Sequence, residues 1–471
     1  MARTPPEGDR VRTMDAFEGF ADLLATRVRD DPEATCLLVE DGGQARAVTW
    51  RAFDDRVAAR ARELAATGAA CEALLATGGI DCLAEAFACV IAGLQCALID
   101  PFETDEEAGR LIAACDADAL WAPEKRRTGL AGALRTGAAP TRVRPRQILF
   151  FTSGTTARAK PVVLTDASLM ASAWRGASML PLAPDDRLLA ALPLSHVFGL
   201  VCGVLWGMQC GCPVALDRGV RHFEDDFALF EPTAVALVPT LARWALARDA
   251  FGPKLKLVLA GAAPCPPGLA RDVRARGIRL CAGYGLTETS SGLALSLGDD
   301  PDAMTVCPRT QVRIGRGGDV IVRAPGSLMR GYYGQGDALP ADGWLATGDA
   351  GRIDESGRLH VRGRMKDVAI LANGTKLFIP EYERIVREAL GEEDVAVVVR
   401  HGRPLLVCGT LRRHQGTTAG EISRELAPAL TRYPRASQIT RTVMLNHALP
   451  RTAAGDVRRW SIQEELEQWQ P

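Results

Sequence analysis

The segment between residues 152 and 160 combines small hydroxyl side chains, one glycine and basic residues in a way that suits phosphate binding. It reads Thr152, Ser153, Gly154, Thr155, Thr156, Ala157, Arg158, Ala159, Lys160, and it follows an apolar run at 148–151. Small side chains let backbone N–H groups face an anion closely, hydroxyl groups add donors, and Lys160 adds a compact positive charge. The order differs from the Walker pattern, because no Gly-Lys-Ser/Thr follows at the required spacing. Taken alone, the segment fits a polyphosphate cradle and an ordinary polar loop equally well.

Strand and helix patterns alternate around this loop and must position it. We predict strands at 73–76, 96–99, 119–122 and 148–151, with helices at 81–92, 104–115 and from about 166. This alternation is typical of parallel βαβ units. Upstream, the pattern predicts a helix at 15–29, strands at 35–40 and 47–50, and a helix at 51–66; further strands are predicted at 187–192, 214–216, 234–238 and 255–259.

The sequence pattern changes twice toward the end of the chain. Residues 315–324 contain short strands and glycine turns, which predict a β-rich segment. Beyond residue 364, strands are predicted at 366–372, 395–400 and 405–411, with helices at 381–389 and 421–430. This tail has the size of a small α+β domain. The chain is therefore divided into a disordered start at 1–14, a large domain at 15–363, a hinge at 364–366 and a small domain at 367–471.

Bulk properties exclude several classes of protein. A chain of 471 residues needs more than one core, and a net charge of −1 argues against a nucleic-acid-binding surface. The thirteen cysteines are scattered without zinc-ligand spacing, and no signal-peptide pattern opens the sequence, so we expect reduced thiols in a cytoplasmic protein. The uncharged run at 198–216 is interrupted by glycine, glutamine and proline. It predicts a buried helix and a core strand rather than a membrane span.

Five motifs occur in a fixed order and have to be interpreted together. They are the segment 152–160, then Gly283-Tyr284-Gly285-Leu286-Thr287-Glu288, Thr347-Gly348-Asp349, Gly363-Arg364-Met365-Lys366-Asp367 and Leu449-Pro450-Arg451-Thr452-Ala453-Ala454-Gly455. This set resembles the adenylate-forming superfamily, which includes acyl-CoA synthetases, peptide-synthetase adenylation domains and firefly luciferase. The resemblance covers residues from about 15 to 460, and five ordered motifs of this kind do not arise readily by chance.

The resemblance implies an α/β fold and an enzymatic activity. A large N-terminal domain of βαβ sheets and a distorted β-barrel is expected, with a small mobile C-terminal α+β domain. The implied reaction activates a carboxylic acid with ATP and Mg²⁺ to an acyl-adenylate and releases pyrophosphate. The acyl group then passes to a thiol, of CoA or of a carrier protein, or to another nucleophile. The enzyme would thus be an AMP-forming acid–thiol ligase.

The same resemblance assigns roles to individual residues. Tyr284 offers a flat face for adenine, Thr287 can donate to the α-phosphate, and Glu288 can hold Mg²⁺, a hard cation that prefers carboxylate oxygen. Asp349 can accept both ribose hydroxyls, although a turn or cap role is its plain alternative. The remaining assignments are Gly283, Gly285, Gly261, Ala262 and Ala263 beside the nucleotide, Arg364 near the ribose, Lys366 as the hinge residue and Gly374 in the acceptor channel.

His196 marks the segment that resembles the opening of the acyl pocket. The segment reads Pro193-Leu194-Ser195-His196-Val197-Phe198-Gly199. A lone histidine is often purely structural, and a substrate-side role is the alternative that we carry forward. No aspartate stands at the place that grips an α-amine in amino-acid-activating relatives. An aryl or short acyl acid without a free α-amine is therefore favoured.

The sequence departs from the family pattern at the phosphate loop and near the end. Ala157, Ala159 and Pro161 stand where Gly, Pro and Gly are usual, and Asp166 stands where histidine is common. The family lysine that bridges carboxylate and α-phosphate is replaced by Asp456, so the chain is interpreted as an atypical member without that catalytic lysine. An anion beside the reacting phosphate should be strongly adverse, because a comparable electrostatic contact contributes about 10²–10³ in rate.

Several functions stay open at this point. A nearby cation, Arg451, Arg458 or Arg459, could replace the lysine in a working ligase. The chain could instead perform only the acyl-transfer half-reaction or depend on a partner for adenylation. A third alternative is a non-catalytic nucleotide-binding regulatory subunit. Amide- or diazo-forming ligase chemistry is a further, minor alternative, and an atypical stand-alone member suits secondary metabolism.

Overall fold

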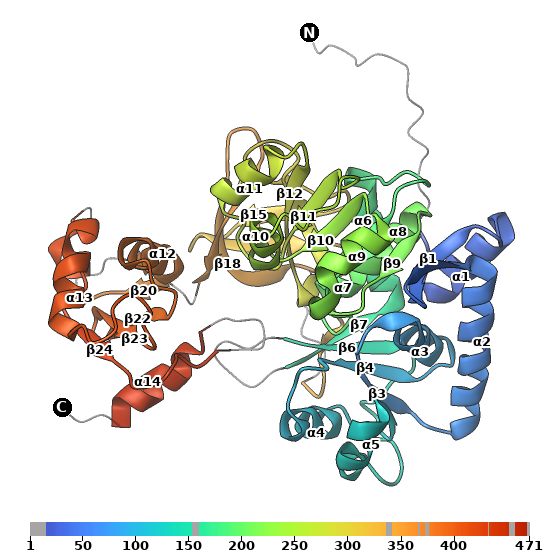
Figure 1. Cartoon of the computed structure of the whole chain (residues 1–471). Coiled ribbons are helices and arrows are strands. Elements are labelled where there is room, and N and C mark those ends of the chain that lie inside the picture. Colours follow the sequence, from blue (N-terminus) through green and yellow to red (C-terminus); the bar gives the residue numbers. More distant parts are fainter. Residues whose placement is uncertain are drawn as a thin grey trace.

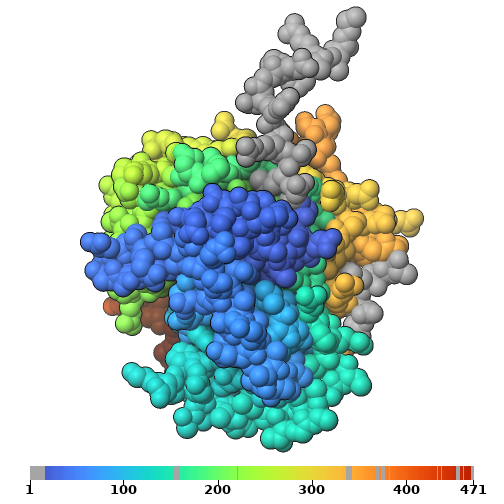
Figure 2. Space-filling model, turned by 90° about the vertical axis from the view of Figure 1, so that its right-hand side faces the viewer, coloured from blue at the N-terminus to red at the C-terminus, as the bar shows by residue number. Residues whose placement is uncertain are grey.

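The computed structural model describes residues 16–152, 160–335, 342–365, 368–372, 376–431, 433–451 and 457–468. A large α/β body holds the N-terminal three quarters of the chain, and a small α+β body carries the C-terminal elements (Figure 1). This division confirms the predicted fold class. Figure 2 shows the face of the large body that the N-terminal elements build.

A six-stranded sheet carries the predicted phosphate segment. Its strands run in the order β17-β7-β6-β4-β3-β5, and the bounds are β3 (Cys71–Leu75), β4 (Gln95–Ile99), β5 (Ala119–Trp121), β6 (Gln147–Phe151), β7 (Pro161–Thr165) and β17 (Gly331–Tyr332). Strands β3, β4, β5 and β6 are parallel to one another. Helix α3 (Gly79–Ile91) connects β3 to β4, and α4 (Asp105–Ala114) connects β4 to β5, which confirms the βαβ prediction. β7, which was not predicted, returns antiparallel to β6. Both ends of the segment 152–160 are therefore fixed on neighbouring strands.

A nine-stranded sheet forms the centre of the large body. Its order is β14-β13-β12-β11-β10-β8-β9-β1-β2, with β1 (Thr35–Asp41), β2 (Gln44–Thr49), β8 (Leu188–Ala190), β9 (Val214–Leu216), β10 (Ala234–Leu237), β11 (Leu257–Ala260), β12 (Arg279–Leu286), β13 (Ser291–Leu295) and β14 (Thr305–Val306). The inner strands are parallel, and β13 turns back antiparallel on β12. The residues 283–286 thus lie at the end of a central strand, where parallel sheets commonly bind ligands.

Helices cover these sheets and bury their apolar faces. They are α1 (Phe20–Asp30), α2 (Trp50–Thr67), α5 (Glu124–Leu130), α6 (Asp166–Met179), α7 (Val197–Leu200), α8 (Trp206–Cys210), α9 (Phe223–Phe230), α10 (Pro239–Ala247) and α11 (Pro267–Arg274). A π-helix at Val201–Leu205 connects α7 to α8. The run 198–216 is therefore a buried helix followed by strand β9, as predicted. Within the described residues, no helix has the length and hydropathy that crossing a membrane requires.

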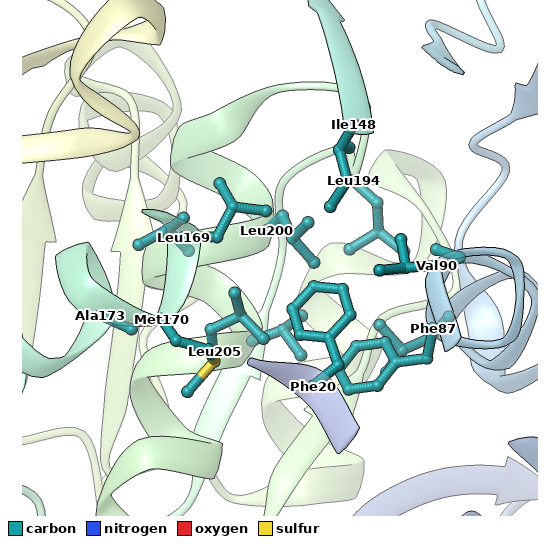
Figure 3. Close-up of a cluster of buried hydrophobic side chains, with 14 of the residues drawn as sticks. Phe20, Phe87, Val90, Ile148, Leu169, Met170, Ala173, Leu194, Leu200 and Leu205 are labelled. Carbon is teal, nitrogen blue, oxygen red and sulfur yellow. The ribbon is translucent and has the colours of Figure 1, made fainter. Parts of the chain in front are cut away.

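The main apolar core joins α1, α3, α6 and the helix that follows residue 197. Figure 3 shows Leu169, Met170 and Ala173 of α6 pointing toward Leu200 and Leu205. In the same cluster, the rings of Phe20 and Phe87 stack with their centroids 4.1 Å apart.

Asp166 explains why α1 begins at Phe20 and not at residue 15 as predicted. Its Oδ2 accepts the backbone N–H of Phe20 at 3.1 Å. A Cβ atom at Gly19 would lie 2.4 Å from the same oxygen, so glycine is the residue that fits there. The aspartate at this unusual position therefore fixes the start of a helix far away in the sequence.

The predicted β-rich segment forms a four-stranded antiparallel sheet at the end of the large body. It contains β15 (Gln311–Ile314), β16 (Asp319–Arg323), β18 (Leu345–Ile353) and β19 (Leu359–Arg364). β18 and β19 pair so that Asp349 lies opposite Arg364. Two motifs that are separated in the sequence are therefore register partners.

The C-terminal body has apolar clusters of its own. Its elements are β20 (Val368–Ile370), β21 (Lys376–Phe378), α12 (Ile379–Leu390), β22 (Val395–Arg400), β23 (Arg403–Cys408), α13 (Ala419–Leu426), β24 (Thr442–Met444) and α14 (Arg459–Gln468). Two clusters of buried side chains draw only on residues from Leu371 to Leu466. The hinge at 364–366 stays a prediction, because Lys366 lies outside the described residues.

The structure also corrects and extends the sequence prediction. No helix was predicted at α5, because its Gly129 and its short length give no apolar period. α14 and β24 were not predicted either. All thirteen cysteines are unpaired in the structure, and all but Cys202 and Cys210 are buried.

A buried carboxyl group in the six-stranded sheet makes stability depend on pH. Glu72 of β3 is 2% exposed, and burial together with the neighbouring Glu85 carboxylate raises its pKa from 4.5 to about 9. Glu85 itself accepts two hydrogen bonds from Arg60, at 2.6 and 2.8 Å. The native state therefore keeps a proton that the unfolded state releases above pH 4.5.

We expect the free energy of unfolding to fall as pH rises from about 5 to 9. Glu72→Gln should flatten this dependence and stabilise the protein at pH 8 by about 1–3 kcal/mol, because the amide stays neutral. Denaturant melts across that pH range test the prediction, with the exposed Glu63→Gln as control. A wild-type slope that survives in Glu72→Gln would contradict it.

Candidate active site

Three of the predicted site residues meet at the junction of the nine-stranded and four-stranded sheets. The Tyr284 hydroxyl donates to Asp349 Oδ2 at 2.6 Å, and Arg364 Nε lies 3.2 Å from Asp349 Oδ1. Asp349 is only 4% exposed, and Arg364 also donates to the Thr347 carbonyl at 3.2 Å. Burial, followed by the charge of Asp349, raises the pKa of Tyr284 well above its usual value, so the phenol stays a neutral donor.

Glu288 and Lys160 are brought together by a residue that the sequence did not single out. The Tyr332 hydroxyl donates to Glu288 Oε1 at 2.9 Å, and Lys160 Nζ lies 5.3 Å from the centroid of the Tyr332 ring. Tyr332 belongs to β17, which pairs with β7 immediately after Lys160. Burial and the Glu288 charge raise the pKa of Tyr332 to about 12. Its sequence signal is only an aromatic pair after Gly331.

The carboxylate of Glu288 fits a magnesium ion by its chemistry. One oxygen is engaged by Tyr332, and the other has no partner among the described residues. Mg²⁺ is commonly bound through one or two carboxylates together with substrate phosphates and water. Glu288, with a cation and a hydroxyl group nearby, therefore has the surroundings of a metal–phosphate site.

A tight turn follows strand β12 and carries Thr287 and Glu288. Thr287 opens the 3₁₀ turn Thr287–Thr289, and the two residues after it, Ser290 and Ser291, have φ of 54° and 90°. Left-handed serines are uncommon, and strain of this kind persists where the surroundings enforce it. Thr289 Oγ1 donates to the Ser291 carbonyl at 2.8 Å, which holds the turn.

His196 is paired with a carboxylate that sequence reasoning missed. His196 Nε2 lies 3.1 Å from Asp100 Oδ2, and Asp100 Oδ1 accepts the Phe102 N–H at 2.9 Å. Burial acts to raise the pKa of Asp100, but the bonds from His196 and Phe102 hold it below its ordinary value. Asp100 follows β4, so the contact joins the two large sheets.

The segment 261–263 follows β11 and contacts the same helix as His196. A Cβ atom at Gly261 would lie 2.6 Å from the Phe198 ring, which shows that the ring rests directly on this glycine. Ala262 has φ of 63°, a left-handed value. All three residues were predicted beside the nucleotide; Gly261 packs against the Phe198 ring, whereas Ala262 and Ala263 are exposed.

An apolar cavity lies next to residues 283–285 of strand β12. Its walls are Ser172, Ala173, Gly176, Leu180, Val201, Cys202, Trp206, Leu259, Gly292, Leu295 and Cys307. Gly283 pairs with Leu295 and Gly285 with Gly292, so this end of β12 and one cavity wall are register partners. The cavity thus adjoins the backbone of a predicted nucleotide motif.

Several predicted residues lie outside the described part of the chain. They are Ser153, Gly154, Thr155, Thr156, Lys366, Gly374 and Asp456. At the edge of the phosphate segment, Thr152 Oγ1 accepts the Lys160 N–H at 3.2 Å.

The three arginines near Asp456 have different surroundings. Arg451 pairs with Asp394 at 3.1 Å and Arg459 with Glu383 at 2.7 Å, both within the small body. Arg458 is exposed, and its charge acts on Glu103 at the start of α4.

Comparisons with known proteins agree with this architecture. Residues 24–333 match the model of the AMP-binding enzyme family. The chain is 29% identical to indoleacetate–CoA ligase of Aromatoleum aromaticum over 67% of its length and 66% of that protein. It is 31% identical to a 3-[(3aS,4S,7aS)-7a-methyl-1,5-dioxo-octahydro-1H-inden-4-yl]propanoyl:CoA ligase of Mycobacterium tuberculosis over 71% and 70%. The chain thus matches about two thirds of each relative.

Solved structures match nearly the whole chain. O-succinylbenzoate coenzyme A synthetase of Bacillus subtilis, in complex with ATP and magnesium ion, superposes with a TM-score of 0.79 at 22% identity, over 94% of this chain and 99% of that one. ATP-bound MatB of Rhodopseudomonas palustris gives 0.78 at 22%, over 95% and 99%. The fold is therefore shared from end to end. Together with the family match over 24–333, the chain belongs to the AMP-binding enzyme family.

Proposed function

We propose that this protein is an ATP-dependent acid–CoA ligase that forms an acyl-adenylate, releases pyrophosphate and transfers the acyl group to the thiol of coenzyme A. The similar proteins are CoA ligases of indoleacetate, of a bicyclic propanoate and of 2-succinylbenzoate. The observation that carries the proposal is the meeting of the Tyr284–Asp349–Arg364 cluster, the Glu288–Tyr332–Lys160 cluster and an apolar cavity around one turn.

The residues divide the work of adenylation. Asp349, held by Arg364, would accept hydrogen bonds from the ribose hydroxyls, and the Tyr284 ring would lie against the adenine base. Lys160 and the hydroxyl groups of 152–156 would hold the β- and γ-phosphates, while Glu288 would hold Mg²⁺ against them. An oxygen of the acid carboxylate attacks the α-phosphorus, and the bond to pyrophosphate breaks as the acyl-phosphate bond forms. Thr287 would donate to the oxygen that gains charge.

The acid side of the site supports an acid without an α-amine. None of the eleven side chains that line the cavity carries a charge. His196, paired with Asp100, is proposed at the entrance to this cavity, where it would contact the acyl group or the incoming thiol. Lys366 as hinge and Gly374 as part of the acceptor channel stay proposals of the same kind, and so does a mobile small domain.

Arg458 is the arginine that we propose in place of the family lysine. Arg451 and Arg459 already pair with carboxylates of the small body, whereas Arg458 is exposed and acts on Glu103 of the large body. A guanidinium there can supply positive charge across the interface between the two bodies.

Arg458→Ala is expected to lower adenylate formation about tenfold to a hundredfold, because it removes one charge from the reacting phosphate. Initial rates of ATP–pyrophosphate exchange measure the effect, and the exposed Arg424→Ala on α13 is the matched control. Equal losses in both variants, or none in Arg458→Ala, would contradict the role.

The proposed function itself is tested by ATP–pyrophosphate exchange over a panel of aryl and short acyl acids, with and without coenzyme A. Exchange with at least one acid, and CoA-dependent release of AMP, are expected. Turnover of a supplied acyl-adenylate without exchange would instead support the half-reaction alternative. ATP binding without either activity would favour a regulatory subunit.

A further inference from the structure

The cavity next to residues 283–285 of β12 has two kinds of wall. Leu259, Gly292 and Leu295 belong to strands β11 and β13, next to the turn that carries Thr287 and Glu288. The other wall comes from α6 and from the π-helix segment with the start of α8. In the proposed site the reacting groups follow strand β12, so the helix wall would meet the part of a bound acid that is farther from its carboxyl group.

One polar group on the helix wall has no protein partner. Ser172 of α6 is 2% exposed, and its hydroxyl makes no hydrogen bond to any described residue. The Cys202 thiol, which also lines the cavity, already has a hydrogen-bond partner, since its Sγ lies 3.5 Å from Ser291 Oγ. Buried hydroxyl groups are normally hydrogen-bonded, so an unpaired one beside a cavity calls for a partner in the cavity.

Gly176, on the same wall, leaves space in the cavity, and the helix does not require a glycine at this position. Gly176 lies one turn after Ser172 in the interior of α6, where glycine is less favourable than alanine. A Cβ atom at Gly176 would meet nothing within 4 Å outside its own helix, so no packing contact requires glycine. Gly292 on the strand wall has equally open space. Both glycines add to the volume of the cavity.

The local backbone supports a binding role for this wall. Val201 and Cys202 belong to a π-helix, a conformation that often occurs at functional sites. Leu259 and Leu295, which line the cavity, are also the nearest side chains to the bare Cα of Gly283, at 3.4 and 3.3 Å from an added Cβ. Two side chains that line the cavity therefore pack against Gly283 of strand β12.

From these observations we infer that Ser172 selects the acid: the substrate is an aryl acid that carries one uncharged oxygen, a hydroxyl or carbonyl, at the end remote from its carboxyl group. The lining is apolar apart from Ser172 and the thiols of Cys202 and Cys307, which suits the hydrocarbon part of such an acid. A second carboxylate is excluded, because the lining has no cation to pair with it. This inference rests on the proposed function, and it defines the substrate class of that site.

The test compares phenylpropanoic acid with its para-hydroxy and para-carboxy derivatives, in wild type and Ser172→Ala. Isothermal titration calorimetry gives Kd for each acid without ATP, and ATP–pyrophosphate exchange gives kcat/KM. Wild type should prefer the para-hydroxy acid over the unsubstituted acid by about tenfold to a hundredfold, because a buried hydroxyl left unpaired is costly. Ser172→Ala should lose most of this preference, and its Kd for the unsubstituted acid should equal that of wild type.

Two further variants keep the test independent of folding. Ser178→Ala removes an exposed hydroxyl of the same helix, which donates to the Trp174 carbonyl, and should leave the preference unchanged. Gly176→Ala keeps Ser172 but narrows the wall, and it should weaken binding of the para-hydroxy acid more than that of the unsubstituted acid.

The outcomes separate this inference from the proposed function. Equal preference in wild type and Ser172→Ala, tighter binding of the para-carboxy acid, or no binding of any of the acids would overturn the inference. If Ser172-dependent binding is measured and no acid supports exchange, the inference stands and the proposed ligase activity falls.

Discussion

Replacing Glu288 with alanine is expected to lower adenylate formation by about 10²–10³-fold and to abolish its normal dependence on magnesium concentration. Tyr332 donates to one carboxylate oxygen of Glu288, which leaves the other oxygen available for a metal ion. Without it, neither charge neutralisation of the phosphates nor their alignment with the attacking carboxylate is maintained. The fold should survive, since the side chain is only half-buried and its one described contact is to Tyr332.

Exchange rates over a range of Mg²⁺ concentrations test this expectation. Glu288→Gln keeps the shape and one acceptor but lacks the charge, so it should show most of the same loss. Tyr332→Phe removes the hydroxyl that orients the carboxylate and should cost less, about tenfold. The exposed Glu355→Ala, in the turn between β18 and β19, is the control. A Glu288→Ala enzyme with wild-type rates at low Mg²⁺ would remove this residue from the metal site.

The sequence predicted the site residues that lie within recognisable motifs, and the structure brings three of them into contact. Tyr284, Asp349 and Arg364 are distant in the chain, yet strand pairing places Asp349 opposite Arg364 and next to Tyr284. The alternation of strands and helices also predicted the parallel strands β3, β4, β5 and β6, because parallel βαβ units leave a clear apolar period, but it did not predict β7 or β12.

The residues that were missed depend on contacts without a local signal. Tyr332 lies in a two-residue strand, too short to show a period, and it acts through β7. Asp100 becomes a partner of His196 only when two sheets meet. The cavity could not be predicted because it is made by absent side chains, at Gly176 and Gly292, and by a π-helix that changes which residues face inward.

Gly285→Ala is expected to reduce activity by at least 10²-fold and to destabilise the protein by about 1–3 kcal/mol. A Cβ atom at this position would lie 1.8 Å from the Ser291 carbonyl oxygen and 2.4 Å from its carbon. Both are backbone atoms, so no side chain can rotate away. Ser291 is itself held by Thr289, whose hydroxyl donates to the same carbonyl. The clash must therefore move the turn that carries Thr287 and Glu288.

The strand partner of Gly285 provides the matched control. Gly292 lies opposite it in the β12–β13 pair, and a Cβ atom there would meet nothing within 4 Å. Gly292→Ala should therefore fold with nearly wild-type stability and change only the binding of the larger acids, because its methyl group enters the cavity. Thermal unfolding and exchange rates of both variants test the contrast. A Gly285→Ala enzyme as active as Gly292→Ala would mean that the β12–β13 turn can shift without moving the reacting groups.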